Sequence, residues 1–380
     1  MRTRRIRDLV LPLLCLLMPP AMAQPRAPQD PGTLDPAPRA IAVRAADLLE
    51  RGYLDPASGQ AYAERLRHQA TVGAYDALGG QALADQLTAD LQRVKQDRHL
   101  KVSVGGPPAA GPGPVMIAGP KGAGPAPGGA PSAIGGPMRR RAPAIEHAGW
   151  IAPGIAYIRY NEFPYDEEIT RQTREFLAAH AQARTVIFDL RTHRGGGPAQ
   201  MDVIFPELFS QAQPLVGMES RQAGSPALSG PGLRPSHGGK GNIKEYWVEP
   251  AADAPLAKAR VYVLTSNATG SAGEMFAAAL KWSGRGTLVG ASTAGANHFG
   301  GMEPLGGGLM LFLPDGRTFN LKDGKDWEGD GIAPDIEVTP EHALSATLQR
   351  EGVSQADADA LETRYLPHLP MTRPPMQGVR

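Results

Sequence analysis

Hydrophobic residues recur every three or four positions through the first quarter of the chain. Two stripes follow this period, one of Ile41, Ala45, Leu48 and Leu49 and one of Leu83, Leu87, Leu91 and Val94. That spacing places the apolar side chains on one face of a helix. Turn residues interrupt the pattern at 52–56 and at Gly79-Gly80. The segment from Ile41 to Val102 therefore predicts a bundle of about three helices.

From Trp150 onward, short buried strands alternate with helical patterns. Strands are predicted at 155–158, 185–190, 261–264 and 287–289, and helices at 169–180, 201–209, 271–282, 340–349 and from 355. The polar stretch 211–242 predicts a loop. Pro314-Asp315-Gly316, between the apolar runs 309–313 and 318–321, predicts a hairpin. Strands that alternate with helices indicate an α/β layered fold.

Composition divides these regions, because residues 24–39 and 105–137 are mostly Gly, Pro and Ala and cannot bury a core. The expected order is a signal peptide (1–23), a disordered linker (24–39), a helical N-terminal subdomain (40–104), a Gly/Pro-rich linker (105–145), an α/β core (146–340) and a C-terminal helical tail (341–380). A folded peptide-binding module could not be built from the second linker.

The first residues have the pattern of a secretory signal peptide. Four arginines precede the apolar run Leu9–Met18, and the small-residue site Ala21-Met22-Ala23 follows it. Cleavage after Ala23 would place the mature chain in the periplasm or outside the cell. The run is too short for a permanent membrane anchor. It also contains the sole cysteine, Cys15, so the mature chain is expected to lack disulfides, a thiol nucleophile and a cysteine-ligated metal.

The charges nearly cancel. The chain has 39 Lys and Arg against 38 Asp and Glu, a formal net charge of +1. This balance gives no support for a nucleic-acid partner or for binding to an anionic membrane surface.

The segment 261–276 joins a hydrophobic strand to a helix that starts at Ser271. Backbone N–H groups are unpaired at that position, where they stabilise a developing negative charge. Acyl-transfer enzymes place a nucleophile in such a setting. Ser271 and Glu274 also have the spacing of a capping box, in which the serine only caps the helix. This segment alone leaves both interpretations open.

Three further segments carry candidate chemistry, and each has a plainer structural explanation. Gly195-Gly196-Gly197 follows a strand, where its N–H groups could bind an oxyanion or merely form a tight turn. His99 follows Asp97-Arg98 and acts as a base only if it reaches a nucleophile. Glu328 lies in the acidic stretch 327–338, which is either an exposed loop or a carboxylate near a base. A cation site in this stretch is less favoured, because its carboxylates are not in the register of an EF-hand calcium loop.

An ordered set of short motifs runs from about Ile41 to Val338. The set comprises Gly52-Tyr53, Asp97-x-His99, Gly154–Ile158 with Phe163, Asp189-Leu-Arg191 before Gly195-Gly196, Ser271-Ala-x-Glu274, Gly290-x-x-Thr293-x-Gly295, and Glu328-Gly-x-Gly331 before Pro334-Asp335-Ile-x-Val338. Together they resemble the tail-specific (C-terminal-processing) serine protease family. The nearer branch is similar to interphotoreceptor retinoid-binding protein modules and the tricorn protease core. The resemblance implies a crotonase-like (Clp protease-like) α/β core with a small N-terminal helical subdomain.

The resemblance also implies the catalytic roles. Ser271 would be the nucleophile, His99 the general base and Glu328 the residue that orients the base or its network. The backbone N–H groups of Ala272 and of the Gly195–Gly196 turn would form the oxyanion hole. One branch of the family uses a lysine between two glycines, but Ala296 follows Gly295 here, so that Ser–Lys pair is excluded. The substrate would be a peptide or unfolded protein tail, and neither a cofactor nor a metal is implied.

Two residues depart from the family pattern. Arg98 stands where tricorn has a network serine, and His193 stands where the glycine turn usually carries asparagine, which makes His193 a second candidate base. One alternative is a catalytically inactive module that binds an apolar ligand or peptide in the same cleft. Another is a crotonase-type acyl-thioester enzyme, which the signal peptide disfavours because coenzyme A is cytosolic.

Overall fold

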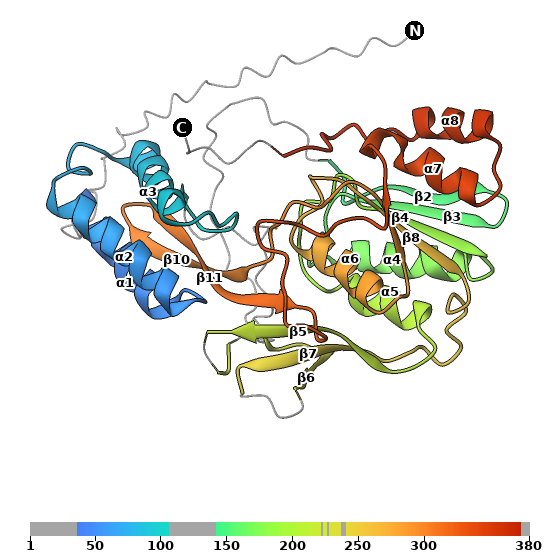
Figure 1. The fold of residues 1–380 in the computed structure, drawn as a ribbon, viewed down its shortest axis with the longest axis horizontal. Helices are drawn as coiled ribbons and strands as arrows, with labels where there is room; N and C mark the ends of the chain where they lie inside the picture. The colour runs from blue at the N-terminus through green and yellow to red at the C-terminus, as the bar shows by residue number, and fades with distance from the viewer. Residues whose placement is uncertain (1–35, 106–141, 222, 226–227, 237–240, 374–380) are drawn as a thin grey trace, which may run out of the picture. The chain divides into compact units, whose positions relative to one another are not determined.

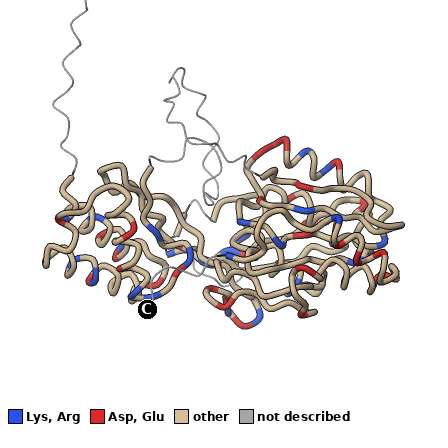
Figure 2. The backbone as a smooth tube through the Cα atoms, turned by 90° about the horizontal axis from the view of Figure 1, so that it is seen from above, with Lys and Arg blue, Asp and Glu red and all other residues tan. Residues whose placement is uncertain are grey.

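The computed structural model describes residues 36–105, 142–221, 223–225, 228–236 and 241–373. The expected signal peptide and most of both expected linkers lie outside these residues. Among the helices of the described ranges, none is both long and apolar enough to cross a membrane. Basic and acidic residues are interspersed over the described backbone (Figure 2).

Three helices form the N-terminal region, as the two apolar stripes predict. They are α1 (Pro38–Gly52), α2 (Pro56–Thr71) and α3 (Gly80–Val94). Asp55 caps α2, because its carboxylate accepts a hydrogen bond from the Ser58 N–H at 3.0 Å. The helices share one apolar core with β1 (Lys101–Val104) and β11 (Leu309–Phe319), to which Leu49, Leu87 and Leu311 belong. The helical region is therefore attached to the rest of the fold through an apolar core.

A six-stranded sheet forms the centre of the second region, in the order β12-β9-β8-β4-β3-β2. Its strands are β2 (Ile145–Ala152), β3 (Ile155–Tyr160), β4 (Thr185–Asp189), β8 (Arg260–Thr265), β9 (Thr287–Gly290) and β12 (Ile336–Glu337). All neighbours are parallel except β2, which runs antiparallel to β3. Parallel strands place their carboxyl ends at one edge, and the turns after β4 and β8 lie there together.

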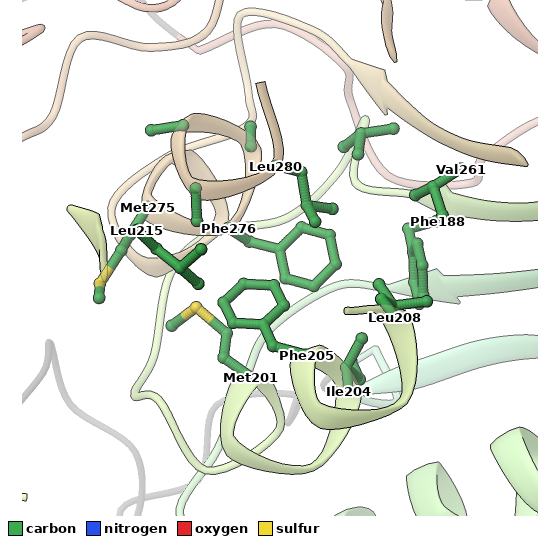
Figure 3. Packing of buried hydrophobic residues seen from close by; sticks show 14 of the residues in the cluster. Phe188, Met201, Ile204, Phe205, Leu208, Leu215, Val261, Met275, Phe276 and Leu280 are labelled. Atoms are coloured by element: carbon green, nitrogen blue, oxygen red, sulfur yellow. The ribbon is translucent and has the colours of Figure 1, made fainter. Parts of the chain in front are cut away.

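Helices cover both faces of this sheet (Figure 1). The helices are α4 (Glu167–Ala179), α5 (Met201–Leu208), α6 (Ala272–Trp282), α7 (Ala343–Arg350) and α8 (Gln355–Arg364). Because side chains alternate along a strand, Ile158 and Phe188 pack with α4, α5 and α6, while Tyr157 and Ile187 pack with α7 and α8. The rings of Phe205 and Phe276 join α5 to α6, with centroids 5.2 Å apart (Figure 3).

A second, antiparallel sheet corrects two predictions. It has the order β1-β11-β5-β7-β6, with β10 also paired to β11, and its other strands are β5 (Gln213–Ser220), β6 (Leu233–Pro235), β7 (Ile243–Val248) and β10 (Phe299–Gly306). Two of these strands lie in the predicted loop 211–242. The predicted hairpin at Pro314–Gly316 is wrong, because β11 continues through it. That strand pairs with β10 up to Gly316 and with β5 from Gly316 onward.

Asp189 ends β4 in a fully buried ionic network. Its carboxylate accepts hydrogen bonds from Arg159 at 3.0 Å and from Arg191 at 2.8 and 3.0 Å. Although burial opposes ionisation, the two guanidinium groups keep the pKa of Asp189 well below its usual range. Arg191 also contacts Glu362 on α8 at 2.8 Å. The Asp189-Leu-Arg191 motif therefore anchors the C-terminal helices beneath the carboxyl edge of the sheet.

Candidate active site

Ser271 lies at the junction of β8 and α6 in a strained backbone conformation. Its φ is 54° and its ψ is −120°, and it is one of two non-glycine residues with positive φ among those described. Such strain is characteristic of functional sites, where surrounding contacts must hold it in place. The hydroxyl of Thr269 donates to Leu190 O at 2.7 Å, which fastens this turn to the end of β4. Ser271 is therefore presented at the carboxyl edge of the sheet by a fixed turn.

Glu274 supplies much of the support for that turn. Its fully buried carboxylate accepts hydrogen bonds from the N–H of Ser271 at 2.8 Å, the hydroxyl of Thr293 at 2.6 Å, and the N–H groups of Gly295 at 2.7 Å and Ala296 at 2.9 Å. Burial raises the pKa of Glu274, and these donors oppose the rise. The capping partner predicted from the sequence thus also joins the Ser271 turn to the loop at 293–298.

The glycine turn after β4 flanks Ser271. A β-carbon placed on Gly195 would lie 3.0 Å from Ser271 Cβ and 3.4 Å from its Oγ. Gly196 has φ 131° and leaves no room for a β-carbon against Phe163. The Gly195 N–H donates to His193 Nδ1 at 3.2 Å, whereas no hydrogen bond among the described residues uses the Gly196 N–H. Of the two predicted glycine donors, Gly196 is the one available to an oxyanion.

Ala272 provides the other predicted donor. It is the first residue of α6, and the N–H groups of Glu274 and Met275 are the first to donate to Ser271 O, at 2.8 and 3.0 Å. Its N–H therefore precedes the hydrogen-bonded part of the helix, where backbone donors face outward and the helix dipole favours negative charge. The geometry brings Ser271, Ala272 and Gly196 to one wall, since all three line the same pocket.

That pocket is largely apolar. Its lining includes Met201, Met218, Leu233, Tyr246, Met275, Phe299 and Trp327, together with Asp202 and Asn297. Asp202 and the Tyr246 hydroxyl are hydrogen-bonded to each other, and burial raises the pKa of Asp202. Concave apolar pockets with a few polar groups are the usual form of a ligand site. Here the nucleophile candidate lies at its wall, so an apolar side chain of a bound peptide would fit beside Ser271.

His193 lies beside the glycine turn. Its buried ring packs edge-on against Phe163 at 4.2 Å, and its Nδ1 accepts the Gly195 N–H. Its buried Nε2 has no hydrogen-bond partner among the described residues. Burial, reinforced by the charge of Arg373, lowers the pKa of His193 to about 3. The Nδ1 contact supports the glycine turn, and the role of His193 as a second candidate base stays a prediction.

His99 lies at the end of the helical region, on the loop between α3 and β1. Asp97 Oδ1 accepts its backbone N–H at 2.8 Å, and its ring packs on Phe312 with centroids 5.5 Å apart. Its buried Nδ1 has no hydrogen-bond partner among the described residues. Burial lowers the pKa of His99 to about 4, so the imidazole is neutral at pH 7. Neither predicted partner, Ser271 or Glu328, makes a recorded contact with this ring.

Glu328 instead binds backbone and approaches another histidine. Its carboxylate accepts the N–H groups of Arg98 at 3.3 Å, Asn297 at 2.7 Å and His298 at 3.1 Å. The Glu328 Oε2 lies 3.9 Å from His298 Nδ1. Burial, and next the charge of Asp97, raise the pKa of Glu328 to about 7. Only the Arg98 backbone is engaged, so this contact does not depend on the side chain at position 98.

His298 is a site residue that the sequence did not indicate. Its Nδ1 lies 2.8 Å from Asp97 Oδ2, which also accepts the Tyr53 hydroxyl at 2.8 Å. Burial opposes protonation, but the hydrogen bond and charge of Asp97 raise the pKa of His298. The same pair lowers the pKa of Asp97 to about 2 despite burial. Asp97 and His298 are 201 residues apart, so no local pattern could pair them.

The ligand atoms of Asp97, His298 and Glu328 lie within 4.8 Å of one another, close enough to surround a cation. However, hydrogen-bond donors already occupy the carboxylate oxygens, namely the Tyr53 hydroxyl, the His298 ring and backbone N–H groups. A metal ion would have to displace these donors. The cluster is therefore a hydrogen-bonded network that joins the helical region to the 293–298 loop.

Comparison with known proteins agrees with this architecture. Three solved structures resemble the chain in fold. A photosystem II D1 C-terminal processing protease is 15% identical, with a TM-score of 0.50 over 80% of this chain and 94% of that one. A lipoprotein from Streptococcus agalactiae is 13% identical, with a TM-score of 0.51 over 86% and 100%. A putative peptidase from Parabacteroides merdae is 15% identical, with a TM-score of 0.52 over 86% and 97%.

The family comparison covers the region that carries Ser271 and Glu328. Residues 154–338 match the description "Peptidase family S41". The match extends from the start of β3 to just beyond β12, so it includes the parallel sheet, the glycine turn and the Ser271 turn. Through this core the chain belongs to peptidase family S41, a family of serine-type peptidases.

Proposed function

We propose that the chain is a periplasmic or secreted serine endopeptidase that cleaves peptides or unfolded protein tails through an acyl-enzyme on Ser271. The observation that carries this proposal is the strained Ser271 at the start of α6, with the Gly196 and Ala272 N–H groups beside it at the wall of an apolar pocket. The N-terminal signal pattern supports the location. The three-layer core is proposed to be of the crotonase-like (Clp protease-like) type.

In the proposed reaction, an imidazole removes the Ser271 proton as Oγ attacks the peptide carbonyl. The Gly196 and Ala272 N–H groups stabilise the oxyanion, and one such donor is typically worth about 3 kcal/mol of transition-state free energy. The protonated imidazole then gives its proton to the leaving amine, and water releases the acyl group from Ser271. No cofactor is needed for these steps.

His99 is the proposed base. Its neutral ring has a free Nδ1, and Asp97 and Glu328 hold the backbone on both sides of it. A second candidate is His298, because its Nδ1 bond to Asp97 reproduces the Asp–His half of a catalytic triad. The two differ in pKa, which is lowered for His99 and raised for His298.

A fluorophosphonate serine probe tests the nucleophile directly. We expect the folded, mature chain to be labelled at Ser271, with the adduct mapped by mass spectrometry, and Ser271→Ala to lose both labelling and peptide turnover. Ser283→Ala is a matched control, because that serine caps the other end of α6. Labelling elsewhere, or turnover that survives in Ser271→Ala, would refute the assignment. A folded wild-type chain without labelling would favour the inactive module that binds an apolar ligand or peptide in the pocket.

A further inference from the structure

The chain's C-terminal segment returns to the Ser271 turn after α8. Three contacts mark its path. Tyr365 O accepts a hydrogen bond from Arg159, the His368 Nδ1 lies 2.9 Å from Glu146 Oε1, and Met371 O accepts the Ala268 N–H at 3.2 Å. Arg159 also pairs with Asp189 in the ionic network beneath the site. The segment is thus fixed at its start, and its Met371 contacts Ala268, which lies three residues before Ser271 in sequence.

Arg373 extends this contact to the residue before the nucleophile. A β-carbon on Gly270 would overlap the Arg373 guanidinium group, so the guanidinium packs directly on Gly270. The charge of Arg373 also lowers the pKa of both His99 and His193, which places it within electrostatic reach of the two imidazoles. A peptide segment of the chain therefore contacts the turn immediately before Ser271, through Ala268 and Gly270.

One nitrogen of the Arg373 guanidinium group, the buried Nε, lacks a hydrogen-bond partner among the described residues. Burial lowers the pKa of Arg373. The charge of the Glu274 carboxylate raises this pKa, whereas the charges of Arg194 and Arg98 lower it further. A buried donor without a partner costs free energy. The contact persists because the upstream anchors keep Arg373 nearby, which gives a tethered segment an effective concentration on the order of millimolar.

We propose that Met371–Arg373 is a peptide ligand of the chain's own active site, which competes in cis with substrate for the approach to Ser271. The inference rests on the proposed role of Ser271 as nucleophile. A tethered ligand with a poorly satisfied side chain can be displaced by a substrate that places better contacts in the adjoining apolar pocket. The backbone contact to Ala268 and the side-chain contact to Gly270 define how an extended peptide would run past the nucleophile.

The first test compares Arg373→Ala with Arg350→Ala in the full chain, since Arg350 is an exposed arginine in the last turn of α7, outside the proposed ligand segment. We expect Arg373→Ala to raise the rate of fluorophosphonate labelling at Ser271 several-fold and Arg350→Ala to leave it unchanged. A synthetic peptide of residues 366–373 should slow labelling of Arg373→Ala, whereas the same peptide with alanine in place of arginine should not. Equal labelling rates in the three proteins would overturn the inference and leave the nucleophile assignment intact.

The second test does not depend on catalysis. The Ala268 N–H donates to Met371 O, so its hydrogen exchange reports whether the segment is in place. In a Ser271→Ala background, adding Arg373→Ala should accelerate exchange at Ala268, and adding Arg350→Ala should not. Unchanged exchange in Arg373→Ala would reject the inference even if the probe fails to label Ser271, a failure that would count against the nucleophile instead.

Discussion

At the scale of single residues, the site depends on how burial sets the protonation of its imidazoles. His99 and His298 lie at opposite ends of the Asp97 carboxylate, one through its backbone N–H and the other through its ring. The ring bond favours the charged form of His298, whereas for His99 burial outweighs the opposing charge of Asp97. The two histidines beside one carboxylate therefore have opposite shifts in pKa.

This difference predicts the pH dependence of the reaction. The pKa of His99 is lowered to about 4, so with His99 as base kcat/KM for a peptide should stay nearly constant from neutral pH down to about pH 5. Loss of a general base typically costs on the order of 10²- to 10⁴-fold in rate, and we expect that loss in His99→Ala. If kcat/KM instead falls as pH drops through a pKa above 6.5, and the large loss of rate occurs in His298→Asn, the base would be His298.

At the scale of elements, the active-site wall is formed where two strand-to-helix turns meet a loop. The turns after β4 and β8 are adjacent because their strands are hydrogen-bonded in parallel. Glu274 then joins α6 to the loop at 293–296. The strained φ of Ser271 can persist only if these contacts fix the turn on both sides.

Glu274→Gln should therefore destabilise the fold. An amide cannot accept hydrogen bonds at both ends, so its NH₂ would face backbone N–H groups that the carboxylate now satisfies. The expected loss is about 2–4 kcal/mol in the free energy of unfolding, measured by urea denaturation. Glu341→Gln, at an exposed position, is the control and should change little. A loss no greater than that of the control would show that the carboxylate does not support the turn.

At the scale of the whole described chain, Asp97, His298 and Glu328 connect the helical region to the core. The Asp97 end is fixed in the helical region by Tyr53 and by Gln92, whose Oε1 accepts the Asp97 N–H at 3.0 Å. The His298 end belongs to the loop that Glu274 joins to α6. The position of His99 is therefore coupled to the Ser271 turn through the carboxylates of Asp97 and Glu274.

This network predicts that the free energy of unfolding falls as pH rises from about 4.5 through neutrality. The pKa of His298 is raised, so its contribution is complete below pH 6.5 and is lost as pH rises through the folded pKa. The pKa of Glu328 rises from 4.5 to about 7, so its proton-linked stabilisation is lost between those values, up to roughly 3 kcal/mol. Asp97 acts oppositely, but only as pH falls below 3.8.

Urea denaturation at about pH 4 and about pH 8.5 should reveal this loss, because the two conditions bracket both transitions. His298→Asn should reduce the difference between the two conditions, whereas His342→Asn, on the short helix η2 (Pro340–His342), should not. A stability that is equal at the two pH values in the wild-type chain would contradict the predicted coupling.

The sequence by itself determined the local elements and the identity of the nucleophile candidate. Periods of two and of three to four residues specify strands and helices through neighbouring positions, so α1, α6, β4 and β8 were predictable. The junction of β8 and α6 is continuous in sequence, so Ser271 and Ala272 could be identified there as site candidates without the tertiary structure. The glycine turn and the Glu328 loop follow one another along the chain in the order seen in a peptidase family, and this order suggested the resemblance.

Only the tertiary structure decided which groups meet. Asp97 pairs with His298 rather than with the His99 ring, Gly196 rather than Gly195 keeps a free N–H, and Arg373 packs on Gly270. The antiparallel partners of β11 were also missed, because a strand's period shows which face is buried and not which strand it pairs with. Sequence periodicity is limited to positions a few residues apart, whereas these contacts are set by how distant segments pack around a shared core.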